Sequence, residues 1–287
     1  GEIPYDRPDL WRRFCNYYFN CLRDVDRHMM KLIHSLEDTG QIDNTIIFMI
    51  SDHGEMLGQQ GARGKIVSWE ESIRVPTHFY HPDLKDKKLC DSVISNIDIV
   101  PTLLEFTGLS KSELRDKHPE LKGNSYAELV ENVNYDNVRD KEGHLIHGVQ
   151  IIPAVFEVAE KFRHTALADG FLAKTKAFMS EGKFLPDFTP PLNYKGVVDK
   201  KHKFLRFFSP RQNNIPTNYD ELTKYNAEYQ LYDLENDPFE MNDLAKDENN
   251  RKLLMSMNDK CNRLADKEIG LENHVIHLPG PDWFWTT

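Results

Sequence analysis

The sequence lacks an excess of basic residues, a long apolar run and any recognisable cysteine motif. Its formal net charge of −10 argues against general binding of nucleic acid, which requires a basic surface. No apolar run reaches the ~20 residues that a membrane-spanning helix needs, so we expect no membrane partner. The four cysteines show no CxxC motif and no regular spacing, which gives no signal of a zinc site or a disulfide framework and favours buried, reduced thiols.

What the chain does contain is enough material for one large or two small globular domains. It has 287 residues, of which 39% are hydrophobic and 29% are charged. Apolar residues recur at steps of three and four over residues 7–37, which predicts one long helix with a single buried stripe. Within this helix Asp24 and Asp26 are flanked by Arg23 and Arg27, a pattern typical of a solvated, ion-paired face rather than of a catalytic carboxylate pair.

The remaining elements are predicted from periodicity and turn residues. We expect strands at 45–51 and 77–81, a loop over 54–64 and a helix over 97–106. Residues 110–145 are typical of a charged connecting region with one short helix at 125–133. The C-terminal part predicts strands at 145–158, 196–198, 203–208 and 229–233, helices at 167–179 and 249–267, and a proline-rich loop at 184–194.

The most informative stretch is an apolar run that ends in a carboxylate, an imidazole and a glycine. Residues 46–50 are uncharged and rich in β-branched side chains, which predicts a strand buried on both faces, as in a parallel sheet. Ligands of such sheets bind beyond the carboxyl ends of the strands, where Asp52 and His53 lie. A carboxylate oxygen beside an imidazole nitrogen can form half of a metal site, although Asp and Gly also favour a simple turn here.

Five blocks of the sequence, taken in order, resemble the sulfatase family of the alkaline-phosphatase-like superfamily. They lie at residues 44–54, 64–65, 70–76, 98–108 and 231–238. The resemblance implies an α/β fold in which residues 1–144 form the C-terminal part of an alkaline-phosphatase-like mixed sheet sandwiched by helices. Residues 145–287 would form a smaller subdomain of antiparallel strands with a terminal helix. The implied activity is hydrolysis of a sulfate ester, of a small molecule or a saccharide, at a metal-bound formylglycine.

The motif from which that formylglycine is made is absent from these residues. The modified Cys or Ser stands in a Cys/Ser-x-Pro-x-Arg motif, yet none of the four cysteines is followed two residues later by proline. The early Asp-Asp pair that supplies the family's other metal ligands is missing too. We therefore expect the C-terminal half of a sulfatase-like protein, inactive alone. Its partner would be the missing N-terminal half, which would carry the formylglycine. The compartment stays open.

Carried over by this resemblance, three side chains have roles in the site. Asp52 and His53 would be metal ligands, and Lys65 would bind a sulfate oxygen and assist the leaving group. Alternatively, His53 hydrogen-bonds the nucleophile, and Lys65 is an ordinary exposed lysine. The family implies Ca²⁺, but calcium prefers oxygen ligands, and manganese or zinc would accept the imidazole more readily. Mn²⁺ and Mg²⁺ stay open as alternatives to Ca²⁺.

Two other functions are compatible with the same residues. A phosphonate monoester or phosphodiester hydrolase of the same superfamily would use an equivalent half-site, because sulfate and phosphate esters share tetrahedral anion geometry. A non-catalytic binding or assembly fragment would carry the residues as vestiges. Separately, the aromatic-rich end that contains Trp283 and Trp285 predicts a partner surface, such as that of a homo-oligomer.

Overall fold

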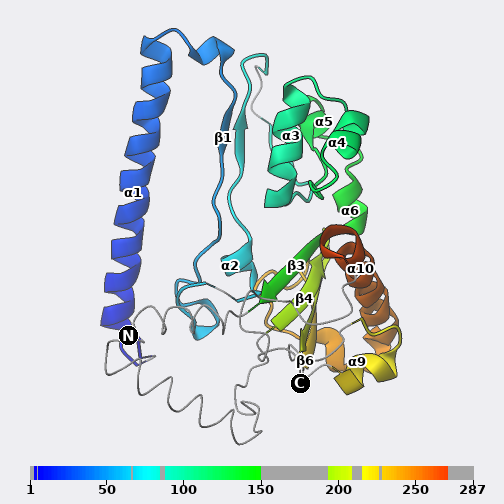
Figure 1. Cartoon of the computed structure of the whole chain (residues 1–287). Coiled ribbons are helices and arrows are strands. Elements are labelled where there is room, and N and C mark those ends of the chain that lie inside the picture. The colour runs from blue at the N-terminus through cyan, green and yellow to red at the C-terminus, as the bar shows by residue number, and fades with distance from the viewer. Residues whose placement is uncertain are drawn as a thin grey trace, which may run out of the picture. The chain divides into compact units, whose positions relative to one another are not determined.

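A computed structural model of the chain describes residues 3–4, 6–65, 67–84, 88–149, 193–208, 215–225 and 228–270 (Figure 1). The chain divides into two compact units. Unit one comprises Gly1–Asp91, Thr102–Leu109 and Ser125–Tyr135, and unit two comprises Ser92–Pro101, Ser110–Asn124 and Asp136–Thr287. Because the units interleave along the chain, the single boundary expected between residues 144 and 145 stays a prediction.

The long first helix forms where the sequence predicts it. Helix α1 (Pro8–Asp38) starts with a proline, whose missing N–H costs no hydrogen bond at that position. It ends at Thr39, and the following Gly40 has a φ of 67°. The prediction of a buried stripe is wrong in degree, because no residue of α1 is fully buried and Leu32 is 69% exposed. The described part of unit one therefore leaves much of the apolar stripe in contact with solvent.

Two short strands follow α1 and pair with each other. Strand β1 (Ile47–Met49) lies antiparallel to β2 (His78–Tyr80), with Phe48 opposite Phe79. The prediction of a strand buried on both faces of a parallel sheet is wrong for the described residues: β1 is half-buried, and β2 alternates between exposed and half-buried positions. A two-stranded sheet lacks the neighbours that would cover both faces. Phe79 instead packs between Phe48 and Phe106, at ring-centroid distances of 4.6 and 5.4 Å.

Short helices fill the segments after the strands. They are α2 (Glu70–Ile73), α3 (Ile99–Phe106), α4 (Lys111–Lys117), α5 (Ala127–Glu131), α6 (Val138–Glu142) and α9 (Tyr219–Tyr225). Further 3-10 turns lie at Ile42–Asn44, Gln59–Gly61, Asn96–Asp98, Leu244–Lys246 and Glu248–Asn250. The helix predicted at 97–106 is confirmed, whereas the predicted connecting region at 110–145 contains α4 and α6 in addition to its one expected helix.

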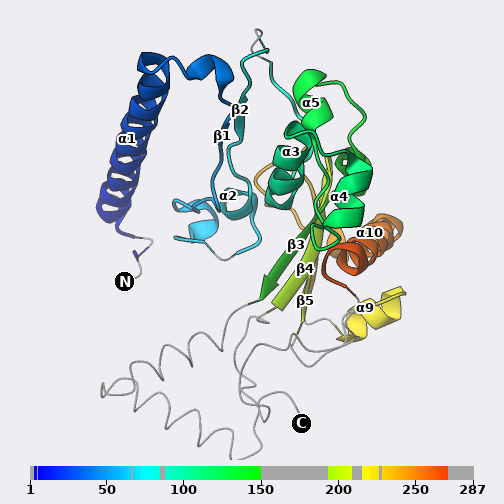
Figure 2. The same ribbon diagram turned by 45° about the horizontal axis from the view of Figure 1, so that its top comes forward.

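Unit two is built on an antiparallel sheet covered by the last helix (Figure 2). Strands β3 (His144–Val149), β4 (Asn193–Val198), β5 (His202–Phe208) and β6 (Glu228–Asp233) pair in chain order. Helix α10 (Arg251–Ile269) packs against β3, β4 and β5. The core between sheet and helix is made by Val197, Phe204, Leu231, Leu254, Met257, Cys261 and Leu264. The antiparallel strands and the terminal helix predicted from the sequence are thus present.

A buried ion cluster ties α10 to the segments before the sheet within unit two. Arg139 donates from Nε and Nη2 to Asp98 at 2.5 and 2.6 Å, and from Nη1 to Glu268 of α10 at 3.0 Å. The Asp98 and Arg139 side chains are each 1% exposed. Since a buried ion is costly unless it is paired and hydrogen-bonded, each member of this cluster depends on the others.

Several predictions concern residues beyond those that the structure describes. The helix at 167–179, the loop up to residue 192 and the aromatic-rich end from residue 271 fall there. The four cysteines are free thiols, as expected, but only Cys261 is buried; Cys21 and Cys90 are exposed. Among the helices whose residues are described, none is long and apolar enough to cross a membrane.

Candidate active site

The acid–imidazole pair lies just beyond β1, where the chain passes so close to the backbone of α2 that only glycine fits at position 54. The Gly54 N–H donates to the Ser72 carbonyl of α2 at 2.8 Å. A Cβ added at Gly54 would lie 2.0 Å from the Glu71 carbonyl oxygen, well inside van der Waals contact. The third residue of the Asp-His-Gly motif therefore lets the chain pass close to α2 and fixes the direction in which Asp52 and His53 leave the strand.

Asp52 is held as an accessible carboxylate beside the imidazole. Its side chain is 83% exposed, and its Oδ2 lies 3.3 Å from His53 Nε2. Its Oδ1 accepts the His53 backbone N–H at 3.0 Å. Partial desolvation acts to raise the pKa of the Asp52 carboxyl, but His53, the two local backbone N–H groups and Lys65 together outweigh it, so this pKa lies below its usual value. The group is ionised at neutral pH and free to bind a cation.

The hydrogen bonds of His53 decide which ring nitrogen carries the lone pair. Nδ1 lies 2.8 Å from the Gly54 carbonyl oxygen, which only accepts, so Nδ1 carries the proton and donates. Nε2 is then an acceptor in the neutral ring, and Lys65 Nζ lies 2.5 Å from it and donates. A backbone carbonyl that fixes the tautomer in this way is the usual second partner of a metal-ligating histidine.

A closed loop carries Lys65 back to the imidazole. Glu55 Oε1 accepts the Gly64 N–H at 2.6 Å, Met56 N–H donates to the Gly64 carbonyl at 3.0 Å, and Met56 is only 1% exposed. The loop is thus closed one residue before Lys65. Our sequence reasoning missed Glu55, although a carboxylate facing a glycine-rich loop is a signal that backbone N–H groups need an acceptor.

Within unit one, residues in the first turns of α1 also contact this loop. The Trp11 ring lies 3.3 Å from the position of a Cβ at Gly58, and Cys15 Sγ lies 3.9 Å from the Leu57 carbonyl oxygen. The Arg63 guanidinium lies 5.5 Å from the Phe14 ring centroid. The helix therefore supports the loop whose last residue is Lys65.

The three residues singled out from the sequence, Asp52, His53 and Lys65, are therefore adjacent, and their donor set suits two positions of a metal shell. A carboxylate and a neutral imidazole whose Nε2 carries a lone pair are both ligands that divalent ions accept. In the described part of the chain, no group of three or more His, Cys, Asp or Glu side chains is placed to hold a metal ion. Because Ca²⁺ takes 6–8 ligands, the pair alone does not complete a shell.

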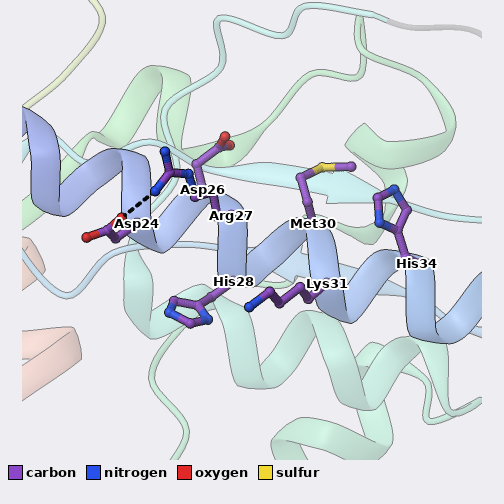
Figure 3. A pocket seen from close by; sticks show the side chains of 7 residues that line it. All are labelled: Asp24, Asp26, Arg27, His28, Met30, Lys31 and His34. Atoms are coloured by element: carbon purple, nitrogen blue, oxygen red, sulfur yellow. Dashed lines mark hydrogen bonds and ion pairs between the residues drawn. The ribbon is translucent and has the colours of Figure 1, made fainter.

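A hollow on the surface of α1 does not bring its polar side chains to one point in this way (Figure 3). It is lined only by α1 residues, namely Asp24, Asp26, Arg27, His28, Met30, Lys31 and His34. Asp24 pairs with Arg27 at 3.0 Å, and both side chains are about two-thirds exposed. In Figure 3 the His28 and His34 rings point to opposite sides of the helix. The predicted solvated, ion-paired face is confirmed, and this hollow is not a candidate site.

Comparison with known proteins finds a family model that is similar to the part of the chain containing Asp52, His53 and Lys65. Residues 5–109 match the family model described as Sulfatase. Curated sulfatases are similar in sequence over 34–41% of this chain, at 33–36% identity. An arylsulfatase of Clostridium perfringens is 33% identical over 121 residues, which are 41% of this chain and 24% of that protein. The matched segments span about a fifth to a quarter of the length of these curated relatives.

Solved structures share the fold over most of the chain. One, determined in complex with its substrate D-glucosamine-2-N,6-O-disulfate, aligns with a TM-score of 0.59 at 19% identity, over 88% of this chain and 40% of that chain. The phosphonate monoester hydrolase of Agrobacterium radiobacter aligns with a TM-score of 0.59 at 20% identity, over 88% of this chain and 41% of that chain. The mixed α/β fold is therefore that of sulfatases and their alkaline-phosphatase-like relatives. The helix-sandwiched central sheet stays a prediction.

Proposed function

We propose that this chain carries part of the active site of a sulfatase, an enzyme that hydrolyses sulfate esters of small molecules or saccharides. The observation that carries the proposal is the convergence of Asp52, His53 and Lys65 at one point within the region that matches the family. A carboxylate, an imidazole with a defined tautomer and an ammonium in contact are the groups that such a reaction needs around a tetrahedral anion.

Lys65 is the group in this chain that faces the developing charge. Its ammonium is a compact cation that can bind a sulfuryl oxygen and stabilise or protonate the leaving alkoxide. The contact with His53 Nε2 holds it in place, and the Glu55–Gly64 hydrogen bond fixes the residue before it. An ester oxyanion that docks here displaces the imidazole as the hydrogen-bond partner of Lys65. The Nε2 atom of His53 can then serve as a metal ligand.

Asp52 and His53 are proposed as metal ligands, through Oδ2 and Nε2. A divalent ion bound there would neutralise sulfuryl oxygens and hold the nucleophile. We propose Ca²⁺ by family resemblance, with Mn²⁺, which accepts an imidazole more readily, and Mg²⁺ as the alternatives to test. The remaining ligands and the formylglycine nucleophile are proposed to come from an N-terminal half that is the partner of this chain, since the relatives are several times longer than the matched region.

A phosphonate monoester or phosphodiester hydrolase is the second candidate. The phosphonate monoester hydrolase of Agrobacterium radiobacter and the disulfate complex align with the same TM-score of 0.59. Both ester classes present a tetrahedral anion, so Asp52, His53 and Lys65 serve either. A panel containing 4-nitrophenyl sulfate and phenyl phosphonate esters separates the two by which substrate has the higher kcat/KM.

The test uses the protein produced from its complete gene. We expect metal-dependent hydrolysis of a sulfate ester that is abolished by Asp52→Ala and by Lys65→Ala. Asp83→Ala is the matched control, because Asp83 is also exposed, at 91%, and also lies beside a histidine, His81, at 3.9 Å. The present chain alone is expected to show no turnover. If the complete protein binds no metal and turns over neither ester class, the chain is a non-catalytic binding or assembly fragment and the proposal is refuted.

A further inference from the structure

Unit two contains a row of basic side chains that the proposed reaction does not use. In the antiparallel sheet His147 of β3 pairs with Lys195 of β4, and Lys195 pairs with Arg206 of β5. Directly opposed residues of antiparallel strands project from the same face and lie close together. The three basic side chains are therefore consecutive neighbours across three strands.

This row lies on the face of the sheet that α10 covers. Val197 and Phe204, two positions away on β4 and β5, belong to the core beneath α10, and alternate residues of a strand share a face. Arg206 is 0% exposed, and its Nη1 donates to the amide oxygen of Asn258 in α10 at 2.6 Å. The row thus runs from a buried guanidinium to half-buried groups on β4 and on β3, the edge strand.

Burial and mutual repulsion disfavour the charged forms of these groups. Burial, and then Arg206, lowers the pKa of Lys195, and burial lowers the pKa of Arg206. Burial, and then Lys195, lowers the pKa of His147 to about 4. The pKa of the nearby Cys261 thiol is raised by burial, so this thiol is neutral at pH 7 and supplies no counter-charge.

Among the residues described, the helix over the row brings it no free carboxylate. Glu268 of α10 is bound in the ion cluster of Arg139, while Asp259 and Asp266 face solvent. His147 Nε2 is buried and has no hydrogen-bond partner in the described structure, and the contact recorded for Lys195 Nζ is the Phe208 ring, 5.6 Å away. A buried imidazole nitrogen without a hydrogen-bond partner and an ammonium without a carboxylate partner therefore lie at the β3–β4 end of the row in the described structure.

We propose that His147, Lys195 and Arg206 form a binding site for a tetrahedral oxyanion, a sulfate or phosphate group. Lys195 supplies positive charge and N–H donors, the buried Arg206 adds positive charge beside it, and His147 supplies a further donor from Nε2. An anion in this position offsets the repulsion along the row and favours protonation of the imidazole. The site lies wholly within unit two and does not rest on the proposed hydrolase function. The anion has two sources, a free inorganic ion or the sulfate group of a saccharide.

The experiment follows the imidazole resonances of His147 by NMR in the chain as it stands, at pH 6. Sodium sulfate is titrated against sodium chloride at matched ionic strength. We expect a saturable shift toward the protonated ring with sulfate and none with chloride. Glucosamine 6-sulfate and glucosamine form the second arm: a tighter response to the sulfated sugar assigns the site to saccharide sulfate, and an equal or weaker one assigns it to the free ion.

Variants test the residues of the row. Lys195→Met removes a charge-assisted donor and is expected to weaken sulfate binding about tenfold or more, whereas Lys195→Arg stays within a few-fold of the wild type. Lys200→Met, at a partly exposed lysine that pairs with Asp140 at 3.6 Å, is the control and leaves the affinity unchanged. An equal loss in Lys195→Met and Lys200→Met overturns the site. If Lys195→Met fails to fold, the wild-type titration decides, because equal responses to sulfate and chloride also overturn it.

Discussion

Replacing Asp98 by Asn is expected to destabilise unit two strongly, although the two side chains have nearly the same shape. Oδ1 accepts from the Asn124 N–H at 2.7 Å and from Arg139 Nη2 at 2.6 Å. Oδ2 accepts from the Ser95 N–H at 2.9 Å and from Arg139 Nε at 2.5 Å. Both oxygens face two donors, so the amide NH₂ of Asn meets two N–H groups in either orientation.

The magnitude follows from the burial of the cluster. Breaking a buried ion pair by removing one partner costs ~3–5 kcal/mol, because the other charge is left buried. Glu268 still pairs with Arg139 at 3.0 Å, so we expect a loss near the lower end, about 3 kcal/mol. At roughly 2–4 °C per kcal/mol, this loss lowers the unfolding midpoint by roughly 6–12 °C.

Thermal and urea unfolding, followed by circular dichroism, measure this loss. Asp136→Asn is the matched control, because Asp136 pairs with Lys141 at 2.6 Å but is 72% exposed. An exposed pair contributes ~0–1 kcal/mol, so the control is expected to unfold close to the wild type. Equal midpoints for Asp98→Asn and Asp136→Asn would show that the buried cluster contributes no more than a surface pair, and would refute the reasoning.

Three further outcomes are expected. Gly54→Ala places a Cβ 2.0 Å from the Glu71 carbonyl oxygen and is expected to cost ~2 kcal/mol or more by overpacking, measured as a shift in the urea midpoint; an unchanged midpoint would contradict the close approach. Glu55→Gln replaces a charged acceptor by a neutral one, so the Gly64 N–H is expected to exchange with solvent about tenfold faster, and unchanged exchange in NMR would show that Glu55 does not close the loop. His147 has a pKa of about 4 in the folded state, below its unfolded value of 6.5, so the unfolded state binds more protons between pH 4 and 6.5. The free energy of unfolding is therefore expected to decrease as the pH falls from 6.5 to 4. This contribution to the slope should vanish in His147→Asn when stability is measured at several pH values without sulfate.

The sequence predicts the elements whose cause is local. The apolar periodicity of α1 and the strand-forming runs of unit two lie within single segments, and the helix and the strands are both found. Helix α4 could also have been predicted from the sequence, because Ser110 and Glu113 form a capping box. The many charged residues of the segment instead favoured the prediction of a connecting region. The pairing of β1 depends on a partner about 30 residues away, and a continuous apolar run does not reveal whether that partner is parallel.

The candidate site could likewise be predicted from the sequence only in part. Asp52 and His53 are adjacent in sequence, and the family resemblance predicted that Lys65 belongs to the same site. Glu55 escaped notice because its function depends on closure of a loop, which no spacing rule describes. The Arg139–Glu268 pair joins residues 129 positions apart, and the basic row depends on the register of three strands. Such contacts follow from tertiary packing and are not visible as periodicity.

The half-covered stripe of α1 bears on how this polypeptide behaves in a test tube. Tyr17, Leu22, Val25 and Leu32 are between 46% and 70% exposed, which is a large amount of hydrocarbon and aromatic surface for one helix. Purified by itself, the polypeptide is expected to bind the dye ANS and to sediment with a mass that grows with concentration. Replacing Leu22 and Leu32 with lysine should suppress both effects while leaving the far-ultraviolet spectrum of the helix intact.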